Sequence, residues 1–154
     1  MFARVVLVLT VIVTLARVVS TYKVFSATSD EPAHISAGME WLQFHEYTYE
    51  LQHPPFARVA VALGPYLQGL RSEEQRKFTS EDLVVMFDEG YNILYSKGDY
   101  ETNLAWARAG TLPFLILLGW VTYGWGRRYF NANVAILAVV LWPLLFLGIS
   151  LHVH

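Results

Sequence analysis

Three long apolar stretches constrain this chain more than any other feature, and they cover about residues 5–25, 109–126 and 134–151. A helix needs about 20 mostly apolar residues to cross the hydrocarbon core of a bilayer. Helices satisfy their own backbone hydrogen bonds, which lipid cannot do for them. We therefore predict an all-α membrane protein with three transmembrane helices. The short sequence RRYFNAN between the last two stretches predicts a tight helical hairpin.

The first apolar stretch has two interpretations, a cleaved signal peptide or a membrane anchor. A signal peptide has a basic amino-terminal region, a short apolar run and a small-residue cleavage site. Here Arg4 is the only basic side chain before the run, Arg17 and Lys23 fall within or after it, and no clean A-x-A sequence follows. We therefore predict an anchor, in which Arg17 either reaches the membrane surface or faces a polar cavity.

The charged residues are unevenly distributed, which predicts the orientation in the membrane. All 13 acidic residues lie between Asp30 and Glu101, a stretch with only five basic residues, whereas the amino terminus and the RRYFNAN turn carry arginines alone. Because basic residues in short loops stay cytoplasmic, we predict a cytoplasmic amino terminus and a long outer loop at about 26–108. The net charge of -2 argues against a nucleic-acid partner, and the absence of cysteine excludes disulfides and thiol catalysis.

The predicted outer loop has the sequence of a folded region. Apolar residues recur at helical spacing, as in AHISAGMEWLQF. Ser29 or Asp30 suits the N-cap of the first helix, and Pro32 suits its first turn. We expect the first two helices to lie in the membrane interface. The predicted helices of the loop cover about 33–44, 55–70, 83–96 and 101–108.

Two adjacent carboxylates, Asp30 and Glu31, follow the first apolar stretch directly. A carboxylate at the depth of the lipid head groups can accept a proton from the hydroxyl of an incoming substrate and so act as a general base. The competing interpretation is that Asp30 only caps a helix, because aspartate is common at that position. The residues alone leave both interpretations open.

The histidines suggest a metal site as an alternative. His34, His45 and His53 lie in the predicted outer loop, and His152 and His154 end the sequence on the same side. Neutral imidazoles and carboxylates together bind zinc. No HxxxH or HxxEH spacing occurs. We therefore assign no metal ligands and no definite cofactor, and leave a divalent metal as an open alternative.

The segment DEPAHISAGMEWLQFHEYTYELQHPPFARVAVALGPYLQGL resembles the first outer loop of the GT-C fold membrane glycosyltransferases, of the bacterial mannosyltransferase and aminoarabinose-transferase type. The resemblance consists of the acidic pair after the first span, His34 shortly after it, a glycine-containing helix, and HPPF opening a second helix. FDEGYNILYSKGDYETNLAWARAGTLPFLILLGW resembles the family's route into the second span, with Arg108 before the apolar stretch. The resemblance runs across nearly the whole chain.

The resemblance implies an inverting glycosyltransferase of the bacterial inner membrane. Such an enzyme moves a sugar from a polyprenyl-phosphate carrier to an acceptor hydroxyl of a lipid, glycan or protein on the outer side. Asp30 matches the catalytic aspartate of the family, the general base, and Glu31 matches its acidic neighbour. Basic side chains in such a site stabilise the departing phosphate. The residues with an implied substrate-binding role are His34, His53, Arg58 and Arg108. We expect the HPP corner, residues 53–55, to lie close in space to the Asp30 turn.

Members of this family have many more spans than this chain, which stops at LHVH. We therefore expect the sequence to be the amino-terminal portion of a longer transferase. Two other classes of function stay open. One is a small non-catalytic membrane protein that binds a partner or lipid through its outer loop, and the other is a metal-binding or transport subunit.

Overall fold

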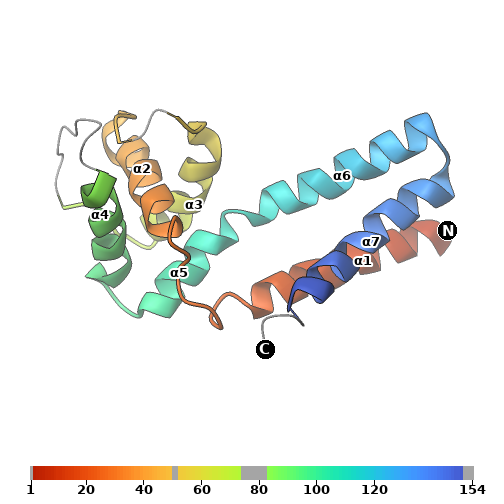
Figure 1. Ribbon diagram of the computed structural model, residues 1–154, viewed down its shortest axis with the longest axis horizontal. Coiled ribbons are helices and arrows are strands. Elements are labelled where there is room, and N and C mark those ends of the chain that lie inside the picture. Colours follow the sequence, from red (N-terminus) through yellow and green to blue (C-terminus); the bar gives the residue numbers. More distant parts are fainter. Residues whose placement is uncertain (1, 50–51, 74–82, 151–154) are drawn as a thin grey trace. The chain divides into compact units, whose positions relative to one another are not determined.

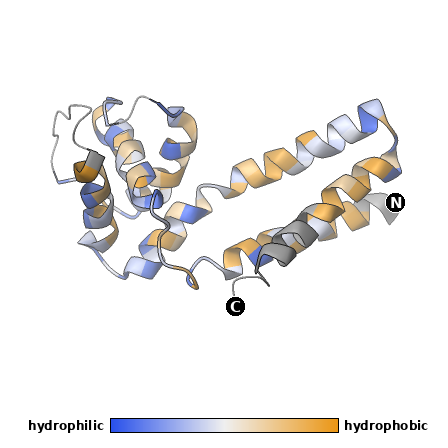
Figure 2. Ribbon diagram, in the orientation of Figure 1, coloured by the Kyte–Doolittle hydropathy of each residue, from blue (hydrophilic) through white to orange (hydrophobic). Residues whose placement is uncertain are grey.

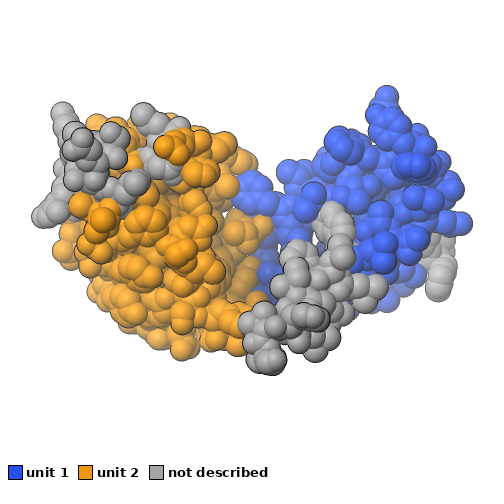
Figure 3. Space-filling model, viewed as in Figure 1, with its two compact units in different colours: residues 1–20, 112–154 blue, residues 21–111 orange. Residues whose placement is uncertain are grey.

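The structure is a computed structural model that describes residues 2–49, 52–73 and 83–150 (Figure 1). Every regular element in these ranges is an α-helix, which confirms the predicted all-α class. The helices belong to two compact units, drawn in different colours in Figure 3. One unit comprises residues 1–20 and 112–154, and the other comprises residues 21–111.

The first unit holds the apolar helices of the chain, which are mostly orange in Figure 2. They are α1 (Phe2–Ser20), α6 (Leu112–Tyr129) and α7 (Ala132–Ser150), and α7 packs on both of the others. Large apolar side chains on their outer surfaces, such as Leu9 and Ile12, are about half exposed. Such a surface suits lipid better than water.

The connection between α6 and α7 is the tight hairpin that the sequence predicts. The side-chain oxygen of Asn131 accepts hydrogen bonds from the backbone N–H groups of Asn133 and Val134, at 3.0 and 3.1 Å. This N-cap starts α7 immediately after the turn. The two helices also approach closely, because a Cβ added to Gly126 would lie 2.8 Å from the Cβ of Ala135.

Length and composition support one membrane-spanning helix in the described part of the chain. The stretch Tyr100–Tyr129 has 30 residues, and an 18-residue window within it has a mean hydropathy of 1.5. The helices Val5–Ser20 and Ala132–Leu141 are apolar but shorter. The third predicted span, 134–151, runs past Leu141 into residues whose side chains are not described, and residue 151 lies outside the described ranges. The three-span topology and its orientation therefore stay predictions.

The first predicted span, 5–25, is too long at its carboxyl end. The helix α1 ends at Ser20, and the next residues form a turn in which the N–H of Val24 donates to the carbonyl of Thr21 at 3.0 Å. A residue far away in the sequence stabilises this turn. The guanidinium of Arg108 binds the backbone carbonyls of Tyr22, Phe25 and Ser26. Nothing in the local apolar pattern signals this partner.

The second unit is a small helical domain built around α2. That helix packs against α3 and α4, while α5 packs against α3 and α4. The core is formed by Ile35 and Met39 of α2 with apolar residues of the other helices, among them Ile93, Leu94 and Leu104. The helices of this unit are α2 (Glu31–Phe44), α3 (Pro55–Leu67), α4 (Leu83–Ser96) and α5 (Tyr100–Ala109).

These bounds confirm the predicted helices, with one clear difference. The second predicted helix of the outer loop covers about 55–70, but α3 ends at Leu67. Gly69 adopts a φ of 81°, its N–H donates to the carbonyl of Tyr66, and the N–H of Leu70 donates to the carbonyl of Pro65. This pair of bonds is a Schellman motif, which ends a helix at a glycine.

Glycine residues let the central helix lie unusually close to its neighbours. A Cβ added to Gly38 of α2 would collide with the backbone carbonyl of Arg58 in α3, and one added to Gly90 of α4 would collide with the carbonyl of Pro32 in α2. The absence of a side chain is therefore required at both positions. Most of the residues from Pro32 to Glu40 are buried as a result. This burial leaves that part of α2 without the free apolar face that an interfacial helix presents.

Candidate functional site

The start of α2 places Asp30 at the N-cap position, but its side chain makes no capping hydrogen bond. Instead, one carboxylate oxygen accepts the hydroxyl of Thr28 at 2.9 Å, and the other lies 3.5 Å from Nε2 of His34. The side chain is 66% exposed. The hydrogen bond from Thr28 is the largest of the influences that lower the pKa of Asp30, so the carboxylate is ionised at neutral pH. The interpretation of Asp30 as only a helix cap is therefore wrong for its side chain.

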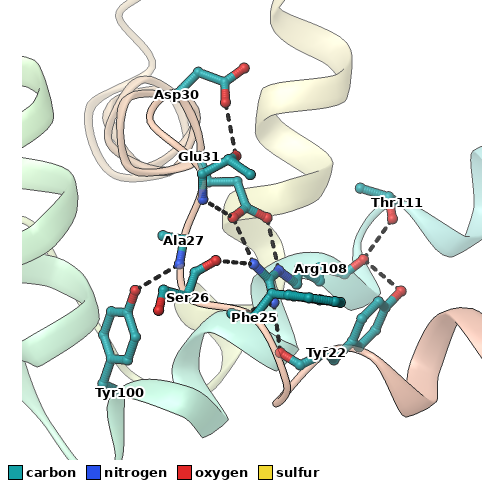
Figure 4. Close-up of polar contacts among 10 residues, drawn as sticks. Tyr22, Phe25, Ser26, Ala27, Asp30, Glu31, Tyr100, Arg108 and Thr111 are labelled. Atoms are coloured by element: carbon teal, nitrogen blue, oxygen red, sulfur yellow. Dashed lines mark hydrogen bonds and ion pairs between the residues drawn. The ribbon is translucent and has the colours of Figure 1, made fainter. Parts of the chain in front are cut away.

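Glu31 points the other way and binds Arg108 (Figure 4). Its two oxygens accept from Nε and Nη2 of the guanidinium, both at 2.8 Å, and one of them also accepts the backbone N–H of Thr28 at 2.8 Å. Burial by itself raises the pKa of Glu31, but the hydrogen bonds and charge of Arg108, with the bonds from Thr28, outweigh it and the pKa is lowered. The bidentate geometry is the strong form of this ion pair.

The remaining donors of Arg108 are also occupied. They bind the backbone carbonyls of Tyr22, Phe25 and Ser26 at 2.7–2.9 Å, so all five N–H groups of the guanidinium have partners (Figure 4). We call the ion pair with Glu31 and these three bonds the Arg108 clasp. The clasp joins α5 to the turn after α1 and to the first residue of α2.

Four of the six predicted site residues gather beside the start of α2. The rings of His34 and His53 have their centroids 6.2 Å apart in an edge-to-face arrangement. Arg58 is 4% exposed and donates to the hydroxyl of Tyr47 at 3.3 Å, and that hydroxyl donates to the backbone carbonyl of His53 at 2.9 Å. The expectation that the HPP corner lies close to the Asp30 turn is therefore confirmed.

The environment of His34 favours its neutral form. Burial is the largest influence, the charge of Arg58 adds to it, and together they lower the pKa of His34 although Asp30 acts in the opposite direction. Its Nδ1 atom is buried and has no hydrogen-bond partner among the described residues. A proton on Nε2 faces Asp30 and leaves Nδ1 as an acceptor. Such an atom can receive a hydrogen bond from a ligand or water.

A cavity of about 130 Å³ opens beside these groups. Such a volume holds several water molecules or part of a larger ligand. Its lining is apolar, with polar groups at Glu31, His34, Arg108 and Thr111. Asp30 does not line the cavity, but its carboxylate lies 3.5 Å from Nε2 of His34, which does. The complete lining consists of Glu31, His34, Ile35, Val61, Leu104, Ala107, Arg108 and Thr111.

The six predicted residues thus meet in one region but divide into two groups. Asp30, His34, His53 and Arg58 form a cluster around an exposed carboxylate. Glu31 and Arg108 belong to the clasp, where the guanidinium has no donor left for a phosphate unless one of its bonds breaks. The predicted phosphate contact of Arg108 therefore stays a prediction that this arrangement does not favour.

Metal binding finds no support in the described part of the chain. No group of three or more His, Asp or Glu side chains there is placed to hold a metal ion. His34 and His53 face each other with Asp30 as the nearby carboxylate. His152 and His154, which the metal alternative also involved, lie outside the described residues.

Sequence reasoning missed several residues that shape this site. Thr28 binds both carboxylates, and Tyr47 joins Arg58 to the histidine corner. Glu40 is buried on α2 and accepts the backbone N–H groups of Thr48 and Tyr49, which fixes the loop before that corner. A threonine two residues before Asp30 is a local signal of a side-chain turn. The tyrosine and the buried glutamate carry no comparable signal.

Comparison with known proteins adds no family assignment. No protein-family model matches the chain, and neither a curated protein nor a solved structure matches it.

Proposed function

We propose that this chain is the catalytic-site portion of a membrane glycosyltransferase that uses a polyprenyl-phosphate sugar and has Asp30 as its general base. One observation carries the proposal: the Asp30 carboxylate is exposed, ionised and unused as a cap, although it begins a buried helix. The sequence resemblance to the GT-C enzymes supplies the reaction class. The apolar helices and the candidate spanning stretch are consistent with a lipid-linked donor.

In the proposed reaction, Asp30 accepts the proton of the acceptor hydroxyl. The hydroxyl oxygen then forms a bond to the anomeric carbon of the sugar, and the bond from that carbon to the carrier phosphate breaks. The electron pair leaves with the phosphate, and attack from the opposite face inverts the anomeric centre. A positioned general base of this kind contributes about 10²- to 10⁴-fold in rate.

The neighbours of Asp30 have supporting roles in this scheme. The neutral His34 offers its unpaired Nδ1 to a hydroxyl of the sugar or the acceptor. Arg58 is buried and provides positive charge near the site, which favours the phosphate as its negative charge develops. Glu31 holds the backbone of the Asp30 turn through the clasp and does not take part in proton transfer.

The test is a transfer assay on membranes that contain the protein as its gene encodes it, with radiolabelled polyprenyl-phosphate sugars as donors. Asp30→Asn keeps the shape of the side chain and removes its basicity, so transfer should fall by about 10²- to 10⁴-fold. The matched control is Asp88→Asn, because Asp88 is an exposed carboxylate on α4 that does not line the cavity. Near-normal transfer by the Asp30→Asn variant would show that this carboxylate is not the base.

A second result would separate the proposal from a non-catalytic function. If the folded wild-type protein transfers no label from any donor tested, the alternative of a membrane protein that binds a partner or lipid gains support. The folded state is checked by circular dichroism in the same preparation.

A further inference from the structure

The helix α3 is apolar on its outer face as well as on the face that packs in the core. Its only charged residue, Arg58, is 4% exposed, whereas Phe56 and Leu67 are each 75% exposed and Leu63 is 43% exposed. A surface helix of a soluble domain turns its apolar side chains to the core and its charges to water. An exposed apolar face on a helix marks a surface that contacts lipid or another apolar partner.

The exposed apolar residues form one continuous line. Phe56, Leu63 and Leu67 are seven and four residues apart, so they lie on one face of the helix with Ala60 between them. We call this face the α3 stripe. No acidic residue occurs between residues 51 and 72, although all 13 acidic residues of the chain lie between Asp30 and Glu101. The stripe thus carries no charge that a lipid surface would repel.

The helix α5, which packs beside α3, carries an exposed tryptophan. A Cβ on Gly64 of α3 would collide with the backbone carbonyl of Trp106 in α5, so these helices touch at that point. Trp106 is half exposed and belongs to the stretch Tyr100–Tyr129, which is long and apolar enough to cross a membrane. Tryptophan is enriched at the boundary between lipid and water.

The length of α3 decides between lying on the membrane and crossing it. Thirteen residues of α-helix measure about 20 Å, which is less than the roughly 30 Å of the hydrocarbon core. A short helix with one apolar face lies in the plane of the interface.

We infer that the α3 stripe is a lipid-docking surface, which inserts Phe56, Leu63 and Leu67 into the head-group region of the bilayer. Gly38 of α2 packs against Arg58 and Ala62 on the opposite face of α3, so this placement sets the Asp30 cluster about one helix diameter from the lipid. This inference needs no catalytic activity and goes beyond the proposed function.

The absence of cysteine from the sequence makes the test direct. Single cysteines are introduced as Phe56→Cys, Leu63→Cys and Leu67→Cys in the full chain, labelled with a nitroxide, and reconstituted into phosphatidylcholine vesicles with one quarter phosphatidylglycerol. Collision rates with oxygen, which concentrates in lipid, and with a water-soluble nickel complex are measured by electron paramagnetic resonance. The matched control is Asn92→Cys, an exposed polar position on α4.

The inference expects oxygen collisions to exceed nickel collisions at all three stripe positions, and the order to reverse at Asn92. Phe56 and Leu67 are largely exposed, and circular dichroism verifies the fold of each variant. Nickel collisions at the stripe equal to those at Asn92 would overturn the inference. So would labels that are immobilised and shielded from both reagents, because a protein surface or a second copy would then cover the stripe.

Discussion

The Arg108 clasp allows a quantitative prediction, because it concentrates five hydrogen bonds on one side chain. Replacement of Arg108 by glutamine removes the ion pair with Glu31 and the bonds to three backbone carbonyls. The side chains of Arg108 and Glu31 are 13% and 25% exposed, so water can replace part of what is lost. Breaking a fully buried ion pair costs about 3–5 kcal/mol. With this partial exposure we expect a loss of about 2–4 kcal/mol in the free energy of unfolding.

Thermal unfolding of the full chain in detergent micelles, followed by circular dichroism, measures this loss. For a chain of this size, about 2–4 kcal/mol corresponds to a decrease of about 4–16 °C in Tm. Arg108→Lys keeps the charge but has three donors in place of five, and it should recover less than half of the loss. The matched control, Lys97→Gln, removes an exposed cation with one long contact of 3.4 Å and should change the stability by less than about 0.5 kcal/mol.

The pH dependence separates the ion pair from simple packing of the arginine stem. The pKa of Glu31 in the folded protein lies below its ordinary value of 4.5. Its contribution to stability is therefore complete above about pH 4.5 and is lost as the pH falls through the folded pKa. The stability difference between wild type and Arg108→Gln should shrink over that acidic range. A difference that stays constant down to pH 3, or a Tm shift no larger than that of Lys97→Gln, would refute the role given to the clasp.

Two further predictions concern the site and the helix packing. The imidazole of His34 should titrate below 6.5 by NMR in micelles. Asp30→Asn should lower the pKa of His34 further, because the carboxylate of Asp30 favours the protonated ring. An unchanged or raised pKa of His34 in this variant would contradict the contact. Gly38→Ala should destabilise the protein by about 1–3 kcal/mol through collision with the Arg58 carbonyl, whereas Gly124→Ala, with open space around it, should be neutral or stabilising in thermal unfolding. Equal effects of the two glycine substitutions would show that the close approach is not real.

Local sequence patterns predicted the helices well, because helical periodicity and turn residues act over a few residues. The apolar spacing in LVVMFDEGYNILYS sufficed to predict α4 with its observed bounds, Leu83–Ser96. Asn131, the first asparagine of RRYFNAN, marks the start of α7 through N-cap contacts that are likewise local. Where a signal was present but weak, as with Gly69 at the end of α3, the predicted bound was three residues too long.

The candidate site was predicted as a set of residues, but not as an arrangement. The acidic pair and the HPP corner were expected to meet, and the edge-to-face contact of His34 with His53 confirms it. The opposite directions of the two neighbouring carboxylates were not foreseen. Asp30 is exposed, whereas Glu31 is bound to Arg108, and adjacent positions in a sequence give no information about which partner each side chain finds.

By itself, the sequence determined an all-helical chain with long apolar helices and a polar, acidic region between them, because composition and periodicity act through each residue's own preference for lipid, water or helix. Only the tertiary structure decided where α1 ends, which carboxylate is exposed, and which face of α3 is apolar toward the outside. Each of these depends on partners distant in the sequence, such as Arg108, 77 residues from Glu31. Such contacts form only when the helices pack.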